Sequence, residues 1–288
     1  MYKIVSIALL FMLLANGTFA QERTLKVITY NIWNGYDWGK DNDRRTKVIN
    51  WLNEQKPDIV ALQELCNYTP EKLKEDAKGW GHNYSVLLKT SGYPVGLTSK
   101  YPIELKEKIL EGMHHGALHC KIAGVDIFAI HFWPLNFKYR EEIENVLERL
   151  KVVRQTNPNY IMLGDFNAYS PIDADLYDTD GYLFTRKKDY VKGERYLIDF
   201  EAMSSLLAFP LVDVCQFYTK GISQRGSFPG RVLGPINHET TEQLVSRLER
   251  IDYILASPDL AKKCIGAKVC NGEENWFLSD HYPVVAEF

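Results

Sequence analysis

The sequence is poor in the features that mark disordered, fibrous or strongly charged proteins. Among its 288 residues, 34 Lys and Arg oppose 37 Asp and Glu, which leaves a net charge of only −3. It contains no internal repeat, no low-complexity segment and no Gly/Ser-rich linker. The 45% hydrophobic and 25% charged residues are typical of a globular protein. These values exclude a disordered tail protein and a collagen-like chain.

Cysteine is also scarce. The five cysteines are Cys66, Cys120, Cys215, Cys264 and Cys270, which are too few for a disulfide-dense small protein. None of them has the CxxC or Cys/His spacing of a zinc site. The odd number leaves at least one free thiol. Cys264 and Cys270 are the closest pair and the expected disulfide, and five reduced, mostly buried cysteines are the alternative.

Long hydrophobic runs are confined to the N-terminus. Lys3 is the only charge among the first twenty residues, and Ile4–Ala15 is nearly all apolar. This run fits the core of a signal peptide and is short for a membrane span. Thr18–Ala20 then offers small residues for cleavage. We therefore expect residues 1–20 to be a signal peptide and the secreted or periplasmic protein to begin at Gln21; a single-span anchor is the alternative.

Residues 21–288 are expected to form one domain and a monomer. Loss of Lys3 with the leader leaves 33 basic against 37 acidic residues. Apolar runs predict strands over 25–33, 59–62, 125–130, 161–163, 251–255 and 284–288. Helical spacing predicts one helix around 48–52, closed by Pro57, and another over 141–154. Because helices and strands do not alternate strictly, layered sheets with helices outside are favoured. Residues 176–243 are the least regular stretch and are expected to hold long loops.

Polar side chains recur at the ends of these expected strands. They are Tyr30-Asn31, Gln63-Glu64, His131, Asp165-Phe166-Asn167, Asp252 and Ser279-Asp280-His281. Strand ends of a packed sheet cluster in space, so such groups converge on one rim. Each residue alone has a plainer interpretation: Asp165 as a turn former, Asn31 as a strand end, or His131 as a core histidine. Independent turn formers, however, have no reason to end so many strands in the same way.

The carboxylates of this set point to a metal ion. Glu64, Asp165, Asp252 and Asp280 have no Lys or Arg directly beside them in the sequence. Carboxylates that lie close together repel each other unless a cation or hydrogen bonds compensate. Oxygen ligands suit Mg²⁺, or Mn²⁺, better than zinc or copper. The sequence therefore predicts a divalent-metal site.

The strings around these residues resemble the endonuclease/exonuclease/phosphatase superfamily. They are TYNIW (29–33), LQE (62–64), IHFWP (130–134), LGDFNAYSP (163–171), RIDYIL (250–255) and SDHYPV (279–284). They run in the family's order from one end of the chain to the other. The resemblance implies the DNase-I-like fold, a four-layer α/β/β/α sandwich with two central mixed sheets. It also implies a metal-dependent phosphoester hydrolase with its site at one sheet edge.

The same resemblance implies a role for each residue. Glu64 would be the principal metal ligand, Asn31 would help to hold the ion or the phosphate, and Asp280 would sit in the metal shell. Asp165 and Asn167 would orient the attacking water and a phosphate oxygen. Asp252 would hold His281 toward the scissile phosphate. His131 would stabilise the charge of the transition state or protonate the leaving oxygen.

The sequence departs from the family pattern in two places. Residues 93–99 lack the Asn that many relatives carry there, and His115 stands where many carry an Arg before Gly-Ala-Leu. If His115 replaces that Arg, its contact with phosphate weakens as the pH rises above its pKa. A solvated turn at His114 and His115 is the alternative.

The substrate stays open at this stage. A phosphodiesterase or nuclease is the leading hypothesis; a phosphomonoesterase, a sphingomyelinase-like phospholipase and a non-catalytic binding module are the alternatives. The mildly acidic chain lacks the basic face of a duplex nuclease. The basic stretch 186–188 lies among aromatic residues, which would suit single strands, or it is a solvated loop. A phospholipase would need exposed aromatics, such as those at 132–133 or 276–277. The run 250–253 argues against an inositol-polyphosphate phosphatase.

Overall fold

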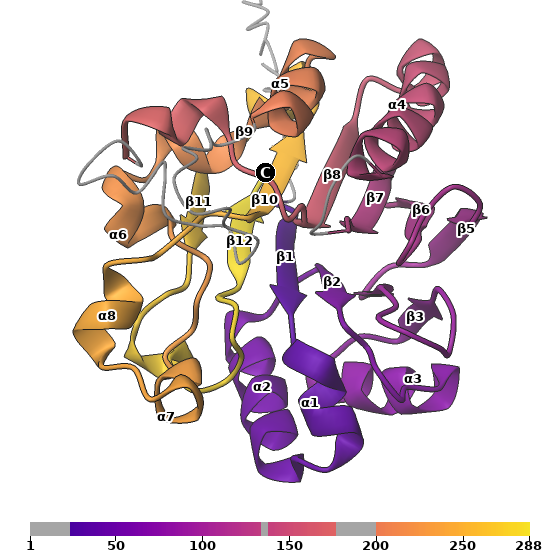
Figure 1. The fold of residues 1–288 in the computed structure, drawn as a ribbon. Helices are drawn as coiled ribbons and strands as arrows, with labels where there is room; N and C mark the ends of the chain where they lie inside the picture. The colour runs from indigo at the N-terminus through magenta and orange to yellow at the C-terminus, as the bar shows by residue number, and fades with distance from the viewer. Residues whose placement is uncertain (1–23, 134–137, 177–199) are drawn as a thin grey trace, which may run out of the picture.

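The computed structural model describes residues 24–133, 138–176 and 200–288 (Figure 1). Two mixed six-stranded sheets pack face to face with helices outside, which confirms the predicted sandwich. The first sheet has the order β11 (Gly266–Val269), β12 (Val284–Glu287), β1 (Lys26–Asn31), β2 (Ile59–Gln63), β4 (Gly96–Ser99) and β3 (Tyr84–Leu87). The second has the order β5 (Ile103–Ile109), β6 (Ala117–Ile122), β7 (Val125–His131), β8 (Tyr160–Asp165), β10 (Asp252–Ala256) and β9 (Val212–Asp213).

Longer helices cover the outer faces of the two sheets (Figure 1). Below the first sheet lie α2 (Asn42–Gln55) and α3 (Pro70–Gly79), and above the second lie α4 (Lys138–Thr156) and α5 (Glu201–Ala208). The short elements are α1 (Trp33–Gly39), η1 (Pro171–Leu176), η3 (Val214–Phe217), α6 (Gly221–Arg225), α7 (Leu233–Asn237), α8 (Thr241–Val245), α9 (Pro258–Ala261) and η4 (Glu273–Asn275).

Local sequence explains where the long helices begin and end. The Asp41 side chain accepts a hydrogen bond from the Arg44 backbone N–H at 2.9 Å and so caps α2. This helix ends where Lys56 adopts a left-handed conformation just before Pro57. Along α4, Ile143 and Val146 lie on the face that packs against the second sheet. That face is the stripe that the helical spacing predicts.

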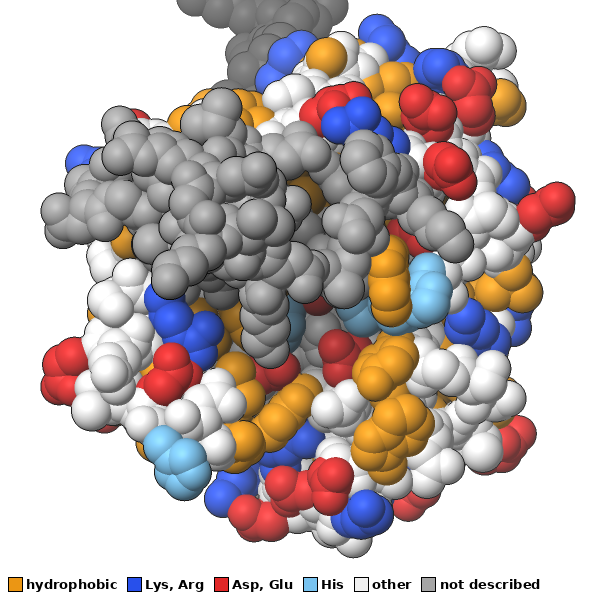
Figure 2. All heavy atoms as spheres, in the orientation of Figure 1, with side chains coloured by type: hydrophobic (Ala, Val, Ile, Leu, Met, Phe, Trp, Pro, Cys, Tyr) orange, Lys and Arg blue, Asp and Glu red, His pale blue; other side chains and the backbone are white. Residues whose placement is uncertain are grey.

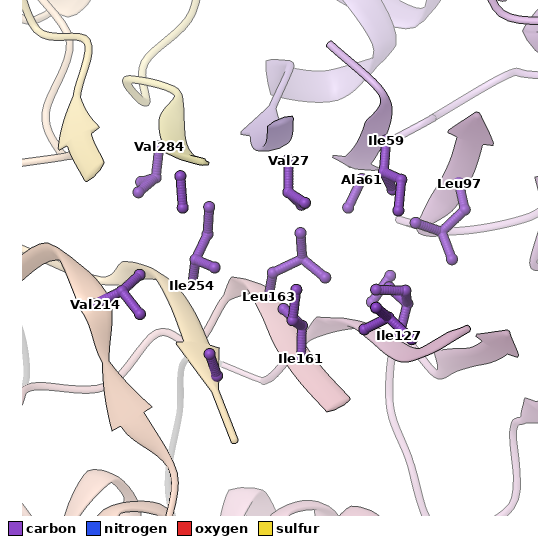
Figure 3. Close-up of a cluster of buried hydrophobic side chains, with 14 of the residues drawn as sticks. Val27, Ile59, Ala61, Leu97, Ile127, Ile161, Leu163, Val214, Ile254 and Val284 are labelled. Carbon is purple, nitrogen blue, oxygen red and sulfur yellow. The ribbon is translucent and has the colours of Figure 1, made fainter. Parts of the chain in front are cut away.

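The space between the sheets is filled with aliphatic side chains. In Figure 3, Val27, Ile59 and Val284 of the first sheet point toward Leu163 and Ile254 of the second. These side chains are fully buried. Each such side chain contributes about 1.5–3 kcal/mol when it leaves water, so this layer fixes the two sheets against each other.

The alternation of side chains along each strand determines where the site forms. On β8, Ile161 and Leu163 face the inter-sheet core, and Asp165 is the next residue of the same face. On β1, Val27 and Asn31 have the same parity. The polar residues therefore continue the inner face at one end of the sandwich, where the apolar layer stops.

Some expectations need correction. All five cysteines are free; Cys264 and Cys270 flank the extended strand β11, which keeps them too far apart for a disulfide.

Residues 200–243, expected to be loops, contain α5, β9 and several short helices. The elements α1, α3, α9, β3–β6 and β11 were not predicted. Among the described residues, no helix combines the length and the apolar character that a bilayer crossing requires. The expected signal peptide and the basic stretch 186–188 lie outside the described residues.

Candidate active site

Strand register places the predicted site residues at one level of the sandwich. Asp165 at the end of β8 pairs with His131 of the parallel neighbour β7 and with Asp252 of the antiparallel neighbour β10. In the other sheet, Asn31 pairs with Gln63. Figure 2 shows a hollow at the centre of the face of the molecule turned toward the viewer, with acidic side chains inside it. The groups named from the sequence therefore meet in one place.

Gly164 permits the close approach of β7 and β8. It has a φ of +148°, and a Cβ at this position would lie 2.0 Å from the carbonyl oxygen of Ile130. A side chain there would push the strands apart. The glycine of the GDFN string thus holds Asp165 next to His131, whose Nε2 lies 3.6 Å from Asp165 Oδ2.

Asn31 bridges the two sheets at the site. Its amide nitrogen donates to Glu64 Oε1 at 3.2 Å and to Asp165 Oδ2 at 3.1 Å. Its amide oxygen accepts from the Trp33 backbone N–H at 3.0 Å, which fixes the orientation of the amide. In this arrangement Asn31 presents N–H, rather than oxygen, to the carboxylates, so it orients Glu64 and Asp165.

His281 lies between two carboxylates. Its Nδ1–H donates to Asp252 Oδ2 at 2.9 Å, and its Nε2 lies 3.8 Å from Asp165 Oδ2. Burial lowers the pKa of His281, but the charges of Asp252, Asp165 and Asp280 raise it further, to well above its ordinary value. His281 is therefore a buried cation at neutral pH.

Asp280 precedes this histidine in the SDH string. Ser279 Oγ donates to the carbonyl oxygen of Asn31 at 2.7 Å and lies 3.3 Å from Asp280 Oδ1. Burial raises the pKa of Asp280 to about 6. The charge of His281 opposes this rise, and the charge of Glu64 adds to it. The effect of Glu64 shows that these two carboxylates are electrostatic neighbours.

Asp165 and Asn167 form a tight turn after β8. Asp165 Oδ1 accepts from the Asn167 backbone N–H at 2.9 Å, and Asn167 Nδ2 donates to the carbonyl oxygen of Phe132 at 2.9 Å. Asn167 has a φ of +46°. Burial and then the charge of Asp252 raise the pKa of Asp165 to about 8, whereas the charge of His281 and the hydrogen bonds from Asn167 and Asn31 favour its charged form.

The two histidines on the β6–β7 side are neutral. Burial, then the charge of His281, lowers the pKa of His131 to about 3. His115 stacks on it at a ring-centroid distance of 4.1 Å, and burial lowers its pKa to about 2. The alternative of a solvated turn is therefore wrong for His115, which is buried, although His114 is exposed. The lowered pKa of His115 also contradicts the expectation that this residue contacts phosphate as a cation and loses the contact as the pH rises.

The conformation of α1 was not predicted from the sequence. Residues 33–38 all have φ between +49° and +62°, so α1 is a left-handed turn. Such a conformation costs roughly 1–2 kcal/mol for each non-glycine residue. Within it, the Asn34 backbone N–H donates to Glu64 Oε2 at 2.7 Å. Glu64, itself at φ +60°, is thus held by this strained segment and by Asn31.

Arg44 was also missed as a residue of the site's support. It is only 5% exposed and donates to the carbonyl oxygens of Ile32, Trp33 and Leu278. These carbonyls belong to the turn beside Glu64 and to the segment that leads into Ser279. No sequence signal separates Arg44 from the surface charges around it in DNDRR.

The residues fit a hard divalent cation. The cluster is rich in carboxylate oxygen, and Asp252 Oδ1 is buried without a hydrogen-bond partner among the described residues. Ligand atoms of Asp165, Asp252 and His281 lie within 4.8 Å of one another. The raised pKa of His281 favours its protonated ring, which cannot bind a metal ion. Glu64 and Asp280 could instead hold the ion, because carboxylate oxygens suit Mg²⁺ or Mn²⁺.

Comparison with solved structures supports the fold. An AP endonuclease from Archaeoglobus fulgidus is 25% identical, with a TM-score of 0.62, over 91% of this chain and 98% of its own. A 3′-5′ exonuclease from Neisseria meningitidis is 21% identical, with a TM-score of 0.68, over 92% and 99%. A variant of the same Neisseria enzyme, described as a 3′ phosphatase and bound to a product DNA hairpin, is also 21% identical, with a TM-score of 0.65 and the same coverage.

None of the curated proteins compared with the chain matches it. A family profile does match, and it spans residues 28–281, from β1 to the histidine of the SDH string. The match covers nearly the whole described chain and includes every predicted site residue. The chain therefore belongs to the Endonuclease/Exonuclease/phosphatase family.

Proposed function

We propose that the protein is a Mg²⁺-dependent phosphodiesterase, and in particular a nuclease. The observation that carries the proposal is the chain of contacts from Asp252 through His281, Asp165 and Asn31 to Glu64. It places a buried cation and several carboxylates in one hollow. Phosphoester hydrolysis needs charge neutralisation on phosphate oxygens and an oriented water, and these groups supply both.

The residues divide this work by their charge. His281, held by Asp252, neutralises charge on a non-bridging phosphate oxygen. Asp165, whose charged form the neighbouring His281 cation favours, orients the attacking water and accepts its proton. His131 and Asn167 donate hydrogen bonds to the phosphate as its charge grows. A bound Mg²⁺, held by Glu64 and Asp280, would neutralise further phosphate charge.

The first test is hydrolysis of bis(p-nitrophenyl) phosphate. We expect activity with Mg²⁺ or Mn²⁺, loss of activity with a chelator, and loss in Glu64→Gln. The matched control is Glu104→Gln on β5, an exposed glutamate paired only with Lys106 in the described structure. Equal activity of wild type and Glu64→Gln contradicts the proposed site.

A substrate panel tests the nuclease. It compares plasmid DNA, single-stranded DNA, RNA, a DNA hairpin with a 3′-phosphate, sphingomyelin and sugar phosphates. The similar solved structures are an AP endonuclease and a Neisseria enzyme described as a 3′-5′ exonuclease and 3′ phosphatase, so DNA substrates are the most informative. Absence of DNA cleavage at low salt, with turnover of sphingomyelin or a monoester, would replace the nuclease with one of those activities. Mg²⁺ binding without any turnover supports a binding module instead.

We also propose that the protein is exported, on the basis of its N-terminal leader. The apolar run and the small residues before Gln21 support cleavage after Ala20. N-terminal sequencing of the protein recovered from its producing cells tests this. A mature chain that begins at Gln21 is expected, and an intact Met1 terminus contradicts it.

A further inference from the structure

One wall of the hollow carries a group of rings that the catalytic roles leave unexplained. This aromatic rim consists of Trp38, Tyr93, His114, His115 and Trp133. It begins at the catalytic centre, where His115 stacks on His131. Figure 2 shows hydrophobic and histidine side chains gathered along one side of the hollow, beside its acidic interior.

The rings form a continuous series of contacts. Tyr93 meets His115 edge to face at a centroid distance of 5.5 Å, and Trp38 meets Tyr93 in the same way at 5.9 Å. Trp133 lies against both His114 and His115. The series therefore extends from a catalytic imidazole to Trp38 at the surface.

The rim is fixed to the same backbone that holds Glu64. Trp38 ends the left-handed run of α1, whose Asn34 N–H binds Glu64. The segment of Tyr93 is tied to Glu64's neighbour, because the Leu65 N–H donates to the Pro94 carbonyl at 3.0 Å. Strained backbone that persists in a fold is often associated with function.

The exposure of the rim does not suit a packing role. Trp38 is 43% exposed beside a charged hollow, which leaves apolar ring surface in water. His115 is buried and its lowered pKa leaves it neutral, so it offers no cation to a phosphate. A wall made mainly of ring faces and edges suits a planar group better than a phosphate.

We infer that the aromatic rim is a stacking subsite for a nucleobase next to the scissile phosphate. The inference rests on the proposed function, since it adds the base that accompanies a nucleic acid phosphate. Stacking on aromatic side chains requires a free face of the base, which single strands and strand ends offer and a continuous duplex does not. The substrate class is thus a nucleotide or strand with an unpaired base.

The test compares two phosphodiesters that release the same leaving group. Thymidine p-nitrophenyl phosphate, as its 3′ and 5′ isomers, carries a base, and methyl p-nitrophenyl phosphate does not. We expect wild type to prefer one thymidine isomer over the methyl ester in kcat/KM by about tenfold or more. Trp38→Ala should lower this preference by about tenfold, and Trp38→Phe, which retains a ring, should keep most of it.

Tyr84→Ala is the matched control. Tyr84 is 41% exposed, much like Trp38, but it pairs with Ser99 at the start of β3, toward the opposite end of the sheet. This variant should keep the wild-type preference.

Two results overturn the inference and leave the proposed function standing. One is hydrolysis of both esters by wild type with equal kcat/KM. The other is a Trp38→Ala variant that loses activity on both equally, because the residue then only supports the fold. If wild type hydrolyses neither ester with Mg²⁺ or Mn²⁺, the proposed function itself fails and the subsite with it.

Discussion

The guanidinium of Arg44 on α2 donates from Nη1 to the carbonyl oxygen of Leu278, 234 residues further along the chain, at 3.1 Å. The same group binds the carbonyl oxygens of Ile32 and Trp33. One buried side chain thus joins the turn that holds Glu64 to the segment that carries His281.

Replacement of Arg44 should impair activity as well as stability. In Arg44→Met the carbonyls lose their partner, and a buried unsatisfied polar group costs about 1–3 kcal/mol. We expect kcat to fall about tenfold or more, well below the unfolding temperature, with KM changed less. Lys47→Met on the same helix, which removes an exposed cation paired with Asp43, is the control. Lower thermal stability with unchanged kcat would show that Arg44 only supports the fold.

Asp252→Asn should lower kcat by about a hundredfold or more. The substitution removes the charge that favours the His281 cation and the acceptor that orients its ring. The control is Asp126→Asn, because Asp126 accepts from His119 at 2.7 Å in a second buried pair at the other end of β7. Similar kcat losses in the two variants would contradict a specific role for the Asp252–His281 pair.

The left-handed turn provides a test through Gly35. A Cβ there would lie 2.1 Å from the carbonyl oxygen of Cys66, and φ is +58°. Gly35→Ala should therefore destabilise the protein by at least about 3 kcal/mol and weaken Mg²⁺ binding, as measured by thermal shift with added metal. Gly81→Ala has a similar φ of +83° but open space around it, so we expect only about 1 kcal/mol and unchanged metal binding.

His82 predicts the acid sensitivity of the fold. Burial lowers its pKa to about 4, and its ring lies between the carbonyl oxygen of Pro57 and Thr98 Oγ1. The unfolded chain takes up this proton near pH 6.5 and the folded protein only near pH 4. The contribution of His82 to stability is thus complete above about pH 6.5 and falls by about 3 kcal/mol as the pH drops to about 4.

Urea unfolding between pH 7 and pH 4 measures this effect. His82→Gln should remove part of the loss of stability, whereas His238→Gln, at an exposed histidine, should leave it in place. Identical pH dependence in the two variants would rule out His82 as the source.

The sequence was sufficient for the buried frame and for the polar residues that the fold brings together at one end of the sandwich. Strands such as β2 and β7 are buried along their whole length, so their apolar runs identify them. By contrast, most side chains of β5 are exposed or only half-buried. Its sequence therefore shows no clear alternation of polar and apolar residues. The alternation of side chains along β8 then explains where the site forms, because Asp165 occupies the next inward position after Ile161 and Leu163.

Other features have no local signal. The left-handed segment from Trp33 to Trp38 makes hydrogen bonds to Arg44 on α2 and to Glu64 after β2, as well as to the nearby Asn31. The aromatic rim likewise joins rings from α1, from the segment before β4 and from both ends of the β6–β7 hairpin. Such groupings arise only after the sheets have packed, so propensity and spacing cannot show them.

The most direct test of the account is the Mg²⁺-dependent hydrolysis of bis(p-nitrophenyl) phosphate by His281→Ala. Because the proposed role of His281 puts its charge against the phosphate, kcat should fall by at least about a hundredfold, while His238→Ala keeps wild-type activity. Full activity of His281→Ala would contradict the assignment of this hollow as the active site.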